Sequence, residues 1–146
     1  MSTIRRIIPV LVYEDIPAAH DFLVDAFGFE AGGVHSDGEG RPVHGEVSAG
    51  DLVIWLHRVT AEHGMASPRG FPAAASQLVV MVDDVDAHFA RARAAGAVID
   101  REPEDMPYAQ REYSARDPEG HRWSFATPLP ATSRVRVTGF APDRPA

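Results

Sequence analysis

The sequence predicts an α+β fold built from two tandem modules, each with the order strand, helix, strand, strand, strand (βαβββ). This order of apolar and turn-forming segments occurs twice, on either side of a stretch rich in glycine and proline at 60–75. The two predicted helices also align at an offset of 68 residues, with the identities Ala19/Ala87, His20/His88, Ala26/Ala94 and Gly28/Gly96. The chain has 146 residues, enough for one domain with its own hydrophobic core.

The first module is predicted over residues 4–59 and begins with an apolar, β-branched run that is typical of a buried strand. Asp15 can cap the helix that follows, Pro17 suits its first turn, and Gly28 ends it. A glycine-rich stretch at 32–40 then holds a predicted hairpin turn at Asp37-Gly38. The strands of this module are predicted at 7–13, 43–48 and 52–59.

The second module is predicted over residues 76–128, after a linker at 60–75. Asp84 or Asp86 caps its helix, and Gly96 ends it. Asp117-Pro118-Glu119-Gly120 has the residues of a type I turn. The strands are predicted at 77–82, 97–100, 112–116 and 121–126. Residues 1–128 are thus predicted to form a single domain, followed by a loosely held, proline-rich tail at 129–146.

The composition excludes several classes of function. The chain has no cysteine, and all fourteen of its basic residues are arginine, so disulfides, thiolate catalysis and Schiff-base lysine chemistry are excluded. A net charge of −7 argues against nucleic acid as a partner. The apolar run after Arg5 and Arg6 is too short for a signal sequence or a spanning helix, so we expect a soluble cytoplasmic protein with no membrane partner.

Three short segments carry a resemblance to a known family. They are Val12-Tyr13-Glu14-Asp15-Ile16, Phe27-Gly28-Phe29 and Asp117-Pro118-Glu119-Gly120-His121. Together with the two βαβββ modules, they make residues 4–128 resemble the vicinal oxygen chelate superfamily, the glyoxalase/bleomycin resistance protein/dioxygenase group. The segments 44–46 and 113–125 look like its PhnB-like or antibiotic-resistance-like branch.

The resemblance implies that each module curls its sheet into a half-barrel and that the pair encloses a cavity. It also implies that metal-dependent members carry one ligand on the first and one on the last strand of each module. These places fall on Ile8, Trp55 (Ile54 if the register slips by one), Gln77 and Ser124. Since a divalent cation needs several oxygen or nitrogen donors, we expect no metal site and no cofactor.

Alternation along the strands predicts which side chains line the cavity. The apolar set expected to face the helices is Leu52, Ile54, Leu56, Leu78, Val80, Val82, Trp123 and Phe125. The set expected to face the cavity is Ile8, Val10, Val12, Val53, Trp55, His57, Gln77, Val79, Met81, Glu112, Ser114, Arg116, Arg122 and Ser124. This second set mixes apolar and polar groups, as expected of a small-molecule pocket.

The candidate ligand-binding residues are Trp55, His57, His44, Glu46, Gln77, Glu112, Ser114 and Ser124. Trp55 offers a flat surface for an aromatic ligand, with core filling as the alternative. His44, His57 and Glu112 are also candidates for acid–base catalysis, with solvated strand positions as the alternative. His20 and His88 are interpreted as surface residues, His121 as support for its turn, and Arg91, Arg93 and Arg101 as a solvated face.

These residues favour a metal-free protein that binds an apolar or aromatic small molecule, and the resemblance implies that it sequesters a ligand such as an antibiotic. The acidic net charge would suit a cationic ligand. The alternative is a lyase, isomerase or dioxygenase of the same fold, with a His/Glu acid–base pair or a relocated metal site of His44, Glu46, His57 and Glu112. A pure interaction module has no support in the residues. The resemblance also implies a homodimer.

Overall fold

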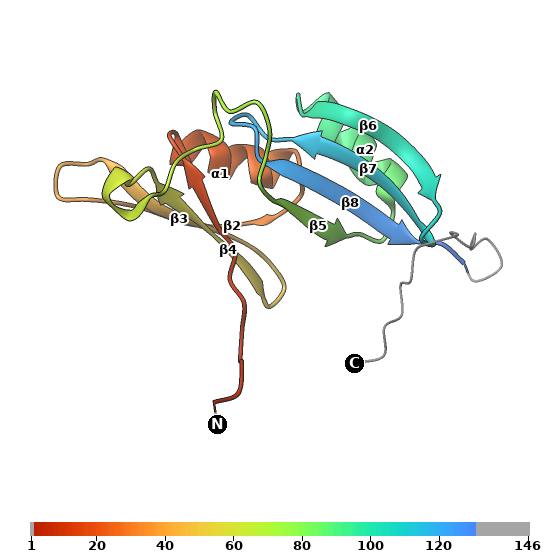
Figure 1. The fold of residues 1–146 in the computed structure, drawn as a ribbon, viewed down its shortest axis with the longest axis horizontal. Helices are drawn as coiled ribbons and strands as arrows, with labels where there is room; N and C mark the ends of the chain where they lie inside the picture. Colours follow the sequence, from red (N-terminus) through yellow and green to blue (C-terminus); the bar gives the residue numbers. More distant parts are fainter. Residues whose placement is uncertain (1, 131–146) are drawn as a thin grey trace.

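The computed structural model describes residues 2–130 and contains two four-stranded sheets, each with one helix against it (Figure 1). The predicted tail at 129–146 lies outside the described residues from 131 onward. The elements of the first module are β1 (Val10–Tyr13), α1 (Ile16–Asp25), β2 (Glu30–Ser36), β3 (Pro42–Ala49) and β4 (Leu52–Arg58). Those of the second module are β5 (Gln77–Met81), α2 (Val85–Ala94), β6 (Val98–Met106), β7 (Gln110–Arg116) and β8 (Arg122–Pro128).

The two sheets have the same topology, so the predicted βαβββ repeat is confirmed. The strand order is β1-β4-β3-β2 in one sheet and β5-β8-β7-β6 in the other. In each, the first and last strands of the module pair in parallel and the remaining pairs are antiparallel. Val10 lies beside Trp55 in the first sheet, and Val79 lies beside Ser124 in the second.

Both predicted helix caps are present. The Asp15 side chain accepts a hydrogen bond from the Ala18 amide at 3.1 Å, and the Asp84 side chain accepts one from the Ala87 amide at 3.1 Å. Of the two predicted caps for α2, Asp84 is therefore the correct one. Asp86 instead accepts hydrogen bonds from Arg111.

Three strands differ from the prediction. β1 begins at Val10 instead of residue 7. β2 runs through a stretch for which the sequence predicts only glycine-rich chain and a turn. Its Gly32 passes so close to β3 that a Cβ atom there would lie 2.4 Å from the Glu46 carbonyl oxygen, so the glycine permits close strand approach. β6 continues to Met106 instead of ending at Asp100, because an edge strand tolerates the polar residues and the proline that follow.

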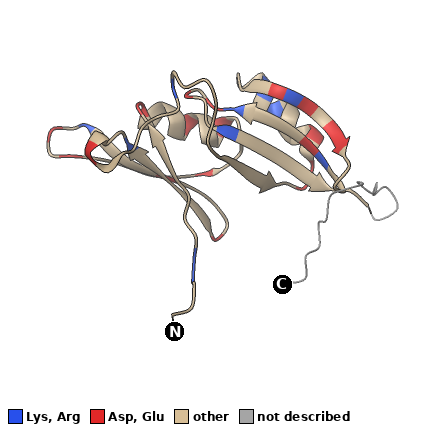
Figure 2. Cartoon of the chain, viewed as in Figure 1, with Lys and Arg blue, Asp and Glu red and all other residues tan. Residues whose placement is uncertain are grey.

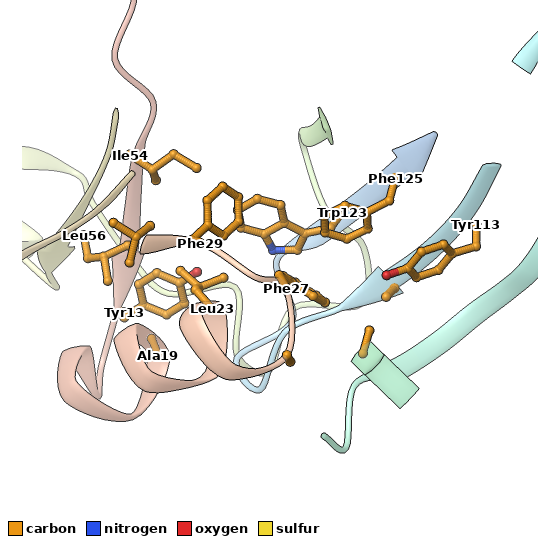
Figure 3. Close-up of a cluster of buried hydrophobic side chains, with 14 of the residues drawn as sticks. Tyr13, Ala19, Leu23, Phe27, Phe29, Ile54, Leu56, Tyr113, Trp123 and Phe125 are labelled. Atoms are coloured by element: carbon orange, nitrogen blue, oxygen red, sulfur yellow. The ribbon is translucent and has the colours of Figure 1, made fainter. Parts of the chain in front are cut away.

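The hydrophobic core lies between the sheets and the helices, and it is continuous across both modules (Figure 3). Phe27, just after α1, contacts Trp123 and Phe125 of β8 with ring centroids 5.4 and 4.7 Å apart. Of the predicted helix-facing set, four residues are buried and three pack partly buried against the core: Ile54, Leu56, Trp123 and Phe125, then Leu78, Val80 and Val82. Leu52 is 75% exposed, so that prediction is wrong, since it directly follows the turn at the end of the sheet.

Two of the segments that carry the family resemblance contact each other across the modules. We call Tyr13, Ser67, Asp117, Glu119 and His121 the inter-module lock. The Tyr13 hydroxyl donates to Asp117 Oδ2 at 2.5 Å, and Asp117 Oδ1 accepts from the backbone of its own turn. The Glu119 carboxylate accepts from Ser67 and from the backbone amides of Glu14 and Asp15 at 2.6–2.9 Å. His121 Nε2 donates to the Val12 carbonyl at 2.8 Å, so it supports more than its own turn.

The helix histidines are structural, and their interpretation as surface residues is wrong. His88 Nε2 donates to the Phe27 carbonyl of the other module at 2.7 Å, while the Tyr113 hydroxyl donates to His88 Nδ1 at 2.6 Å. Burial lowers the pKa of His88, which keeps the ring neutral and suits this pattern of one donor and one acceptor. His20 is 8% exposed and donates to the Gly32 carbonyl. Alternation and helical spacing did not show these long-range partners.

Arg91 also differs from its predicted role in a solvated face. Its guanidinium donates to the carbonyls of Val24 and Asp25 at the end of α1. Because carbonyls at a helix C-terminus lack partners within the helix, a cation there is favourable. Arg91 therefore ties α2 to α1.

Among residues 2–130, neither helix has the length and apolar character that crossing a membrane requires.

Candidate functional site

The candidate site lies on the sheet faces that point away from the helices. In the first module, a group we call the aromatic patch contains His35, His44, Glu46, Trp55 and His57. Cross-strand pairing places Glu46 opposite Trp55, and His44 opposite both His57 and His35. Side chains opposite each other in an antiparallel pair lie on the same face, so β2, β3 and β4 present this patch together.

Trp55 is held in place although it is 37% exposed. Its indole Nε1 donates to Glu46 Oε1 at 3.1 Å, and the His44 ring packs edge-on against it with centroids 5.6 Å apart. A buried core role for Trp55 is therefore excluded. The arrangement fixes a large, flat aromatic surface that still faces outward, which is suited to stacking.

The histidines of the patch form a row across three strands. The His57 ring Nδ1 donates to the Arg58 carbonyl at 2.7 Å, and the His35 and His44 rings stack with centroids 6.1 Å apart. His35 was missed by sequence reasoning. The signal that could have found it is the alternation of β2, which the glycines of that strand concealed.

In the second module, Glu112 is the centre of a polar cluster with Arg101, Tyr108 and Gln110. It is 5% exposed, and its oxygens accept from Arg101 Nη2 at 2.7 Å, from Gln110 Nε2 at 3.0 Å and from the Tyr108 hydroxyl. Arg101 therefore does not belong to a solvated face, because it neutralises a buried carboxylate. Burial, followed by the hydrogen bond to Glu112, raises the pKa of Tyr108.

The remaining candidates of the second module are close to each other. Ser114 lies opposite Ser124 in the β7–β8 pair, and both are buried. The Ser124 hydroxyl donates to Gln77 Oε1 at 3.4 Å. These small hydroxyl groups line the centre of the second sheet face.

The predicted candidates thus divide into two half-sites on separate sheets. Trp55, His44, Glu46 and His57 form one, whereas Glu112, Gln77, Ser114 and Ser124 belong to the other. Within residues 2–130, neither His44 nor His57 hydrogen-bonds to Glu46 or Glu112, so the acid–base pair of the enzyme alternative is not assembled. No three His, Asp or Glu side chains of the described chain are grouped to hold a metal ion, and this includes the relocated site.

The four positions at which metal-dependent members carry their ligands are equivalent in the two modules. Trp55 lies beside Val10, and Ser124 lies beside Val79, so Ile8 and Gln77 are equivalent positions two residues earlier. These positions do not provide the donor set of a divalent cation. Ile8 is a hydrocarbon, the Trp55 indole N–H donates to Glu46, and the Ser124 hydroxyl donates to Gln77. The residues present do not fit the metal.

An apolar groove lies between the first sheet and β5 of the second sheet. It has a volume of about 400 Å³. The residues that line it are Ile7, Pro9, Phe29, Ala49, Leu52, Val53, Ile54, Leu78, Val79, Val80 and Met81. Val79 and Met81, predicted to face the cavity, are each 52% exposed. Val12 is only 7% exposed, so its predicted cavity position does not leave it open to a ligand.

Comparisons with known proteins agree with this fold. The model of the glyoxalase/bleomycin resistance protein/dioxygenase superfamily matches residues 5–125. The chain therefore belongs to this superfamily, and the resemblance of its motifs is confirmed.

Individual relatives are similar over most of their length. An uncharacterised protein of Mycobacterium bovis is 30% identical over 125 residues, which are 83% of this chain and 82% of the relative. The crystal structure of TioX from a Micromonospora species has a TM-score of 0.68 and 32% identity, covering 86% of this chain and 99% of that one. TnmS3, described as an antibiotic binding protein from a Streptomyces species, has a TM-score of 0.64 and 25% identity, covering 88% and 98%.

Proposed function

We propose that this protein binds and sequesters an aromatic, largely apolar small molecule without a metal ion. The observation that carries the proposal is Trp55, a partly exposed indole that Glu46 and His44 hold in one orientation. Because its orientation is already fixed, little side-chain freedom would be lost when a ligand stacks on it. The antibiotic-binding description of TnmS3 supports the same class of ligand.

Binding is favoured over catalysis by the way the polar groups are used. Glu46 accepts from Trp55, and Glu112 accepts from three side chains, so both carboxylates have hydrogen-bonded positioning roles. A general base needs a reachable lone pair near the proton it removes. The metal positions of the superfamily offer no replacement for such a base.

We further propose that two copies of the chain enclose the ligand. The first half-site leaves Trp55 partly exposed in one chain, and the apolar groove between the two sheets exposes Val79, Met81 and Leu52. Burying this surface against a second copy would remove apolar area from water, which is favourable. Sedimentation equilibrium of the wild type should give twice the chain mass of 15.8 kDa, and M81E should give the monomer. A monomeric wild type at micromolar concentration would contradict the dimer.

The ligand proposal is tested by titration with bleomycin, tetracycline and doxorubicin, measured by calorimetry and tryptophan fluorescence. The two tryptophans report separately, since Trp55 is partly exposed and Trp123 is fully buried. We expect at least one compound to bind saturably. W55A should weaken the affinity for that compound about tenfold, because ring stacking is worth about 1–1.5 kcal/mol, and W55F should weaken it less. Equal affinity of wild type and W55A would refute the role of Trp55.

A further inference from the structure

A second cavity, at the end of the second module, gathers arginine side chains. It has a volume of about 440 Å³ and lies between residues 68–74 of the linker and the ends of β6, β7 and β8. Arg69, Arg116 and Arg122 all line it. Figure 2 shows basic segments side by side where β7 ends and β8 begins.

Two of the three guanidinium groups have acidic partners. Asp100 accepts from Arg116 through both oxygens at 3.0–3.1 Å, and Glu14 accepts from Arg69 at 2.8 Å. Arg122 is exposed and has no hydrogen-bond or ion-pair partner within residues 2–130. It is also directly opposite Arg116 in the β7–β8 pair. Because Asp100 already pairs with Arg116, Arg122 is the member of this opposed pair whose guanidinium has no anionic partner in residues 2–130.

The other two acidic residues that line this cavity, Asp117 and Glu119, do not pair with Arg122. The Asp117 oxygens accept from Tyr13, Trp123 and the backbone of the turn. The Glu119 oxygens accept from Ser67 and two backbone amides. Both carboxylates are at most 3% exposed, and both are committed to the inter-module lock. Arg122 is therefore left with its donors directed to solvent and the cavity.

The cavity also contains apolar surface beside the arginines. Phe71 of the linker is 62% exposed, and Val98 of β6 is 48% exposed. Arg122 precedes Ser124 by two residues on β8, so it lies on the same sheet face as the second half-site. A ligand with a ring near Phe71 and an acidic group near Arg122 would satisfy both kinds of surface.

We propose that Arg122 binds an acidic group, a carboxylate or a phosphate monoester, on an aromatic ligand, with Arg116 as its neighbour. This inference rests on the proposed function and names the class of its ligand. The guanidinium fork matches the paired oxygens of both acidic groups. At this cavity the unpaired Arg122 favours an acidic group, whereas the net charge of −7 by itself suits a cationic ligand.

The test uses four probes with the same naphthalene ring: 2-naphthoate, 2-naphthyl phosphate, 2-naphthalenemethanol and 2-naphthylmethylamine. Binding to the full-length wild type, R122Q and R5Q is measured by calorimetry at low salt. R5Q is the matched control, because Arg5 is exposed, lies on the N-terminal segment, and its loss changes the net charge equally. We expect at least one of the two anions to bind wild type about tenfold more tightly than the alcohol, and the amine to bind no better than the alcohol.

R122Q should abolish the advantage of the anion without changing the affinity for the alcohol, and R5Q should change neither by more than about twofold. A preference for naphthoate over the phosphate, or the reverse, identifies which acid the site takes. If the alcohol binds as well as both anions, or if R122Q weakens all four probes equally, the anion site is refuted while the aromatic-binding proposal stands. If none binds, the anion site is refuted, and the antibiotic titration with W55A decides the broader proposal.

Discussion

Two glutamates on the sheet faces have roles set by their hydrogen-bond partners on the same or a neighbouring element. Glu46 orients Trp55 across a strand pair, and Glu112 collects Arg101, Tyr108 and Gln110. Both glutamates are candidate ligand-binding residues from the sequence. Glu112 is a positioning residue, because a carboxylate with three donors has little acceptor capacity left for a substrate. Glu46 positions Trp55 through one hydrogen bond.

We expect E112Q to lower the free energy of unfolding by about 2 kcal/mol while leaving the affinity for an aromatic ligand of the first half-site unchanged. The physical reason is that the partly exposed Arg101 guanidinium loses the buried carboxylate that compensates its charge. E104Q is the matched control, since Glu104 contacts Arg101 at 3.5 Å but is 55% exposed, and its loss should cost less than about 0.5 kcal/mol. Urea unfolding measures both, and equal midpoints for the two variants would contradict the role of Glu112.

Among the elements, β2 shows how a strand can be hidden in its sequence. Two glycines within Glu30–Ser36 remove the hydrophobic alternation that normally marks a strand. The structure explains one of them, because Gly32 lies directly against the backbone of β3 at Glu46. The same contact positions Glu46, which orients Trp55. β2 therefore contributes to the aromatic patch through this close backbone approach as well as through His35.

We expect G32A to destabilise the fold by about 2 kcal/mol or more, because the new methyl group would overlap backbone, which cannot move aside as a flexible side chain does. Gly38 in the adjacent turn is the control: a Cβ there meets nothing within 4 Å, so G38A should change stability by less than about 0.5 kcal/mol. Thermal unfolding compares them. A G32A midpoint equal to that of G38A would show that β2 does not approach β3 so closely.

At the scale of the whole molecule, the inter-module lock joins the two sheets and thereby sets where the half-sites lie. Burial would raise the pKa of Glu119, but hydrogen bonds from Ser67 and from the amides of Glu14 and Asp15 outweigh it, so the pKa lies below the ordinary value of 4.5. The folded state therefore binds the proton less readily than the unfolded state. Stability from Glu119 is present above pH 4.5 and is lost as the pH falls through the lower folded-state pKa.

We expect wild type to lose unfolding free energy as the pH falls below about 4.5, and E119Q to show a shallower loss over that range. At pH 7 the variant should be less stable by about 2 kcal/mol, since a neutral amide accepts weaker hydrogen bonds. The measurement is urea unfolding at several pH values. E62Q, in the exposed linker, should retain the wild-type profile. Parallel profiles for wild type and E119Q would rule out the lock as the acid-sensitive contact.

Local pattern was sufficient for much of the architecture. Short-range geometry determines the caps at Asp15 and Asp84, the turn at Asp117 and the alternation around Leu56 and Trp123. The sequence alone therefore determined the two modules, their core and the sheet face that carries Trp55. Residue type alone also determined that the usual metal positions, at Ile8, Trp55, Gln77 and Ser124, lack a donor set.

Only the tertiary structure decided which polar groups are free to meet a ligand. His88, Arg101 and Glu112 look like surface or site residues along the chain, yet each is satisfied by a group on another element. Conversely, alternation places Arg122 on the cavity face, but only the structure shows that it lies opposite Arg116 without an ion-pair partner in residues 2–130. The reason is physical: whether a charge or hydrogen-bonding group is available depends on what folding brings within about 3 Å of it, and that is a long-range property of the chain.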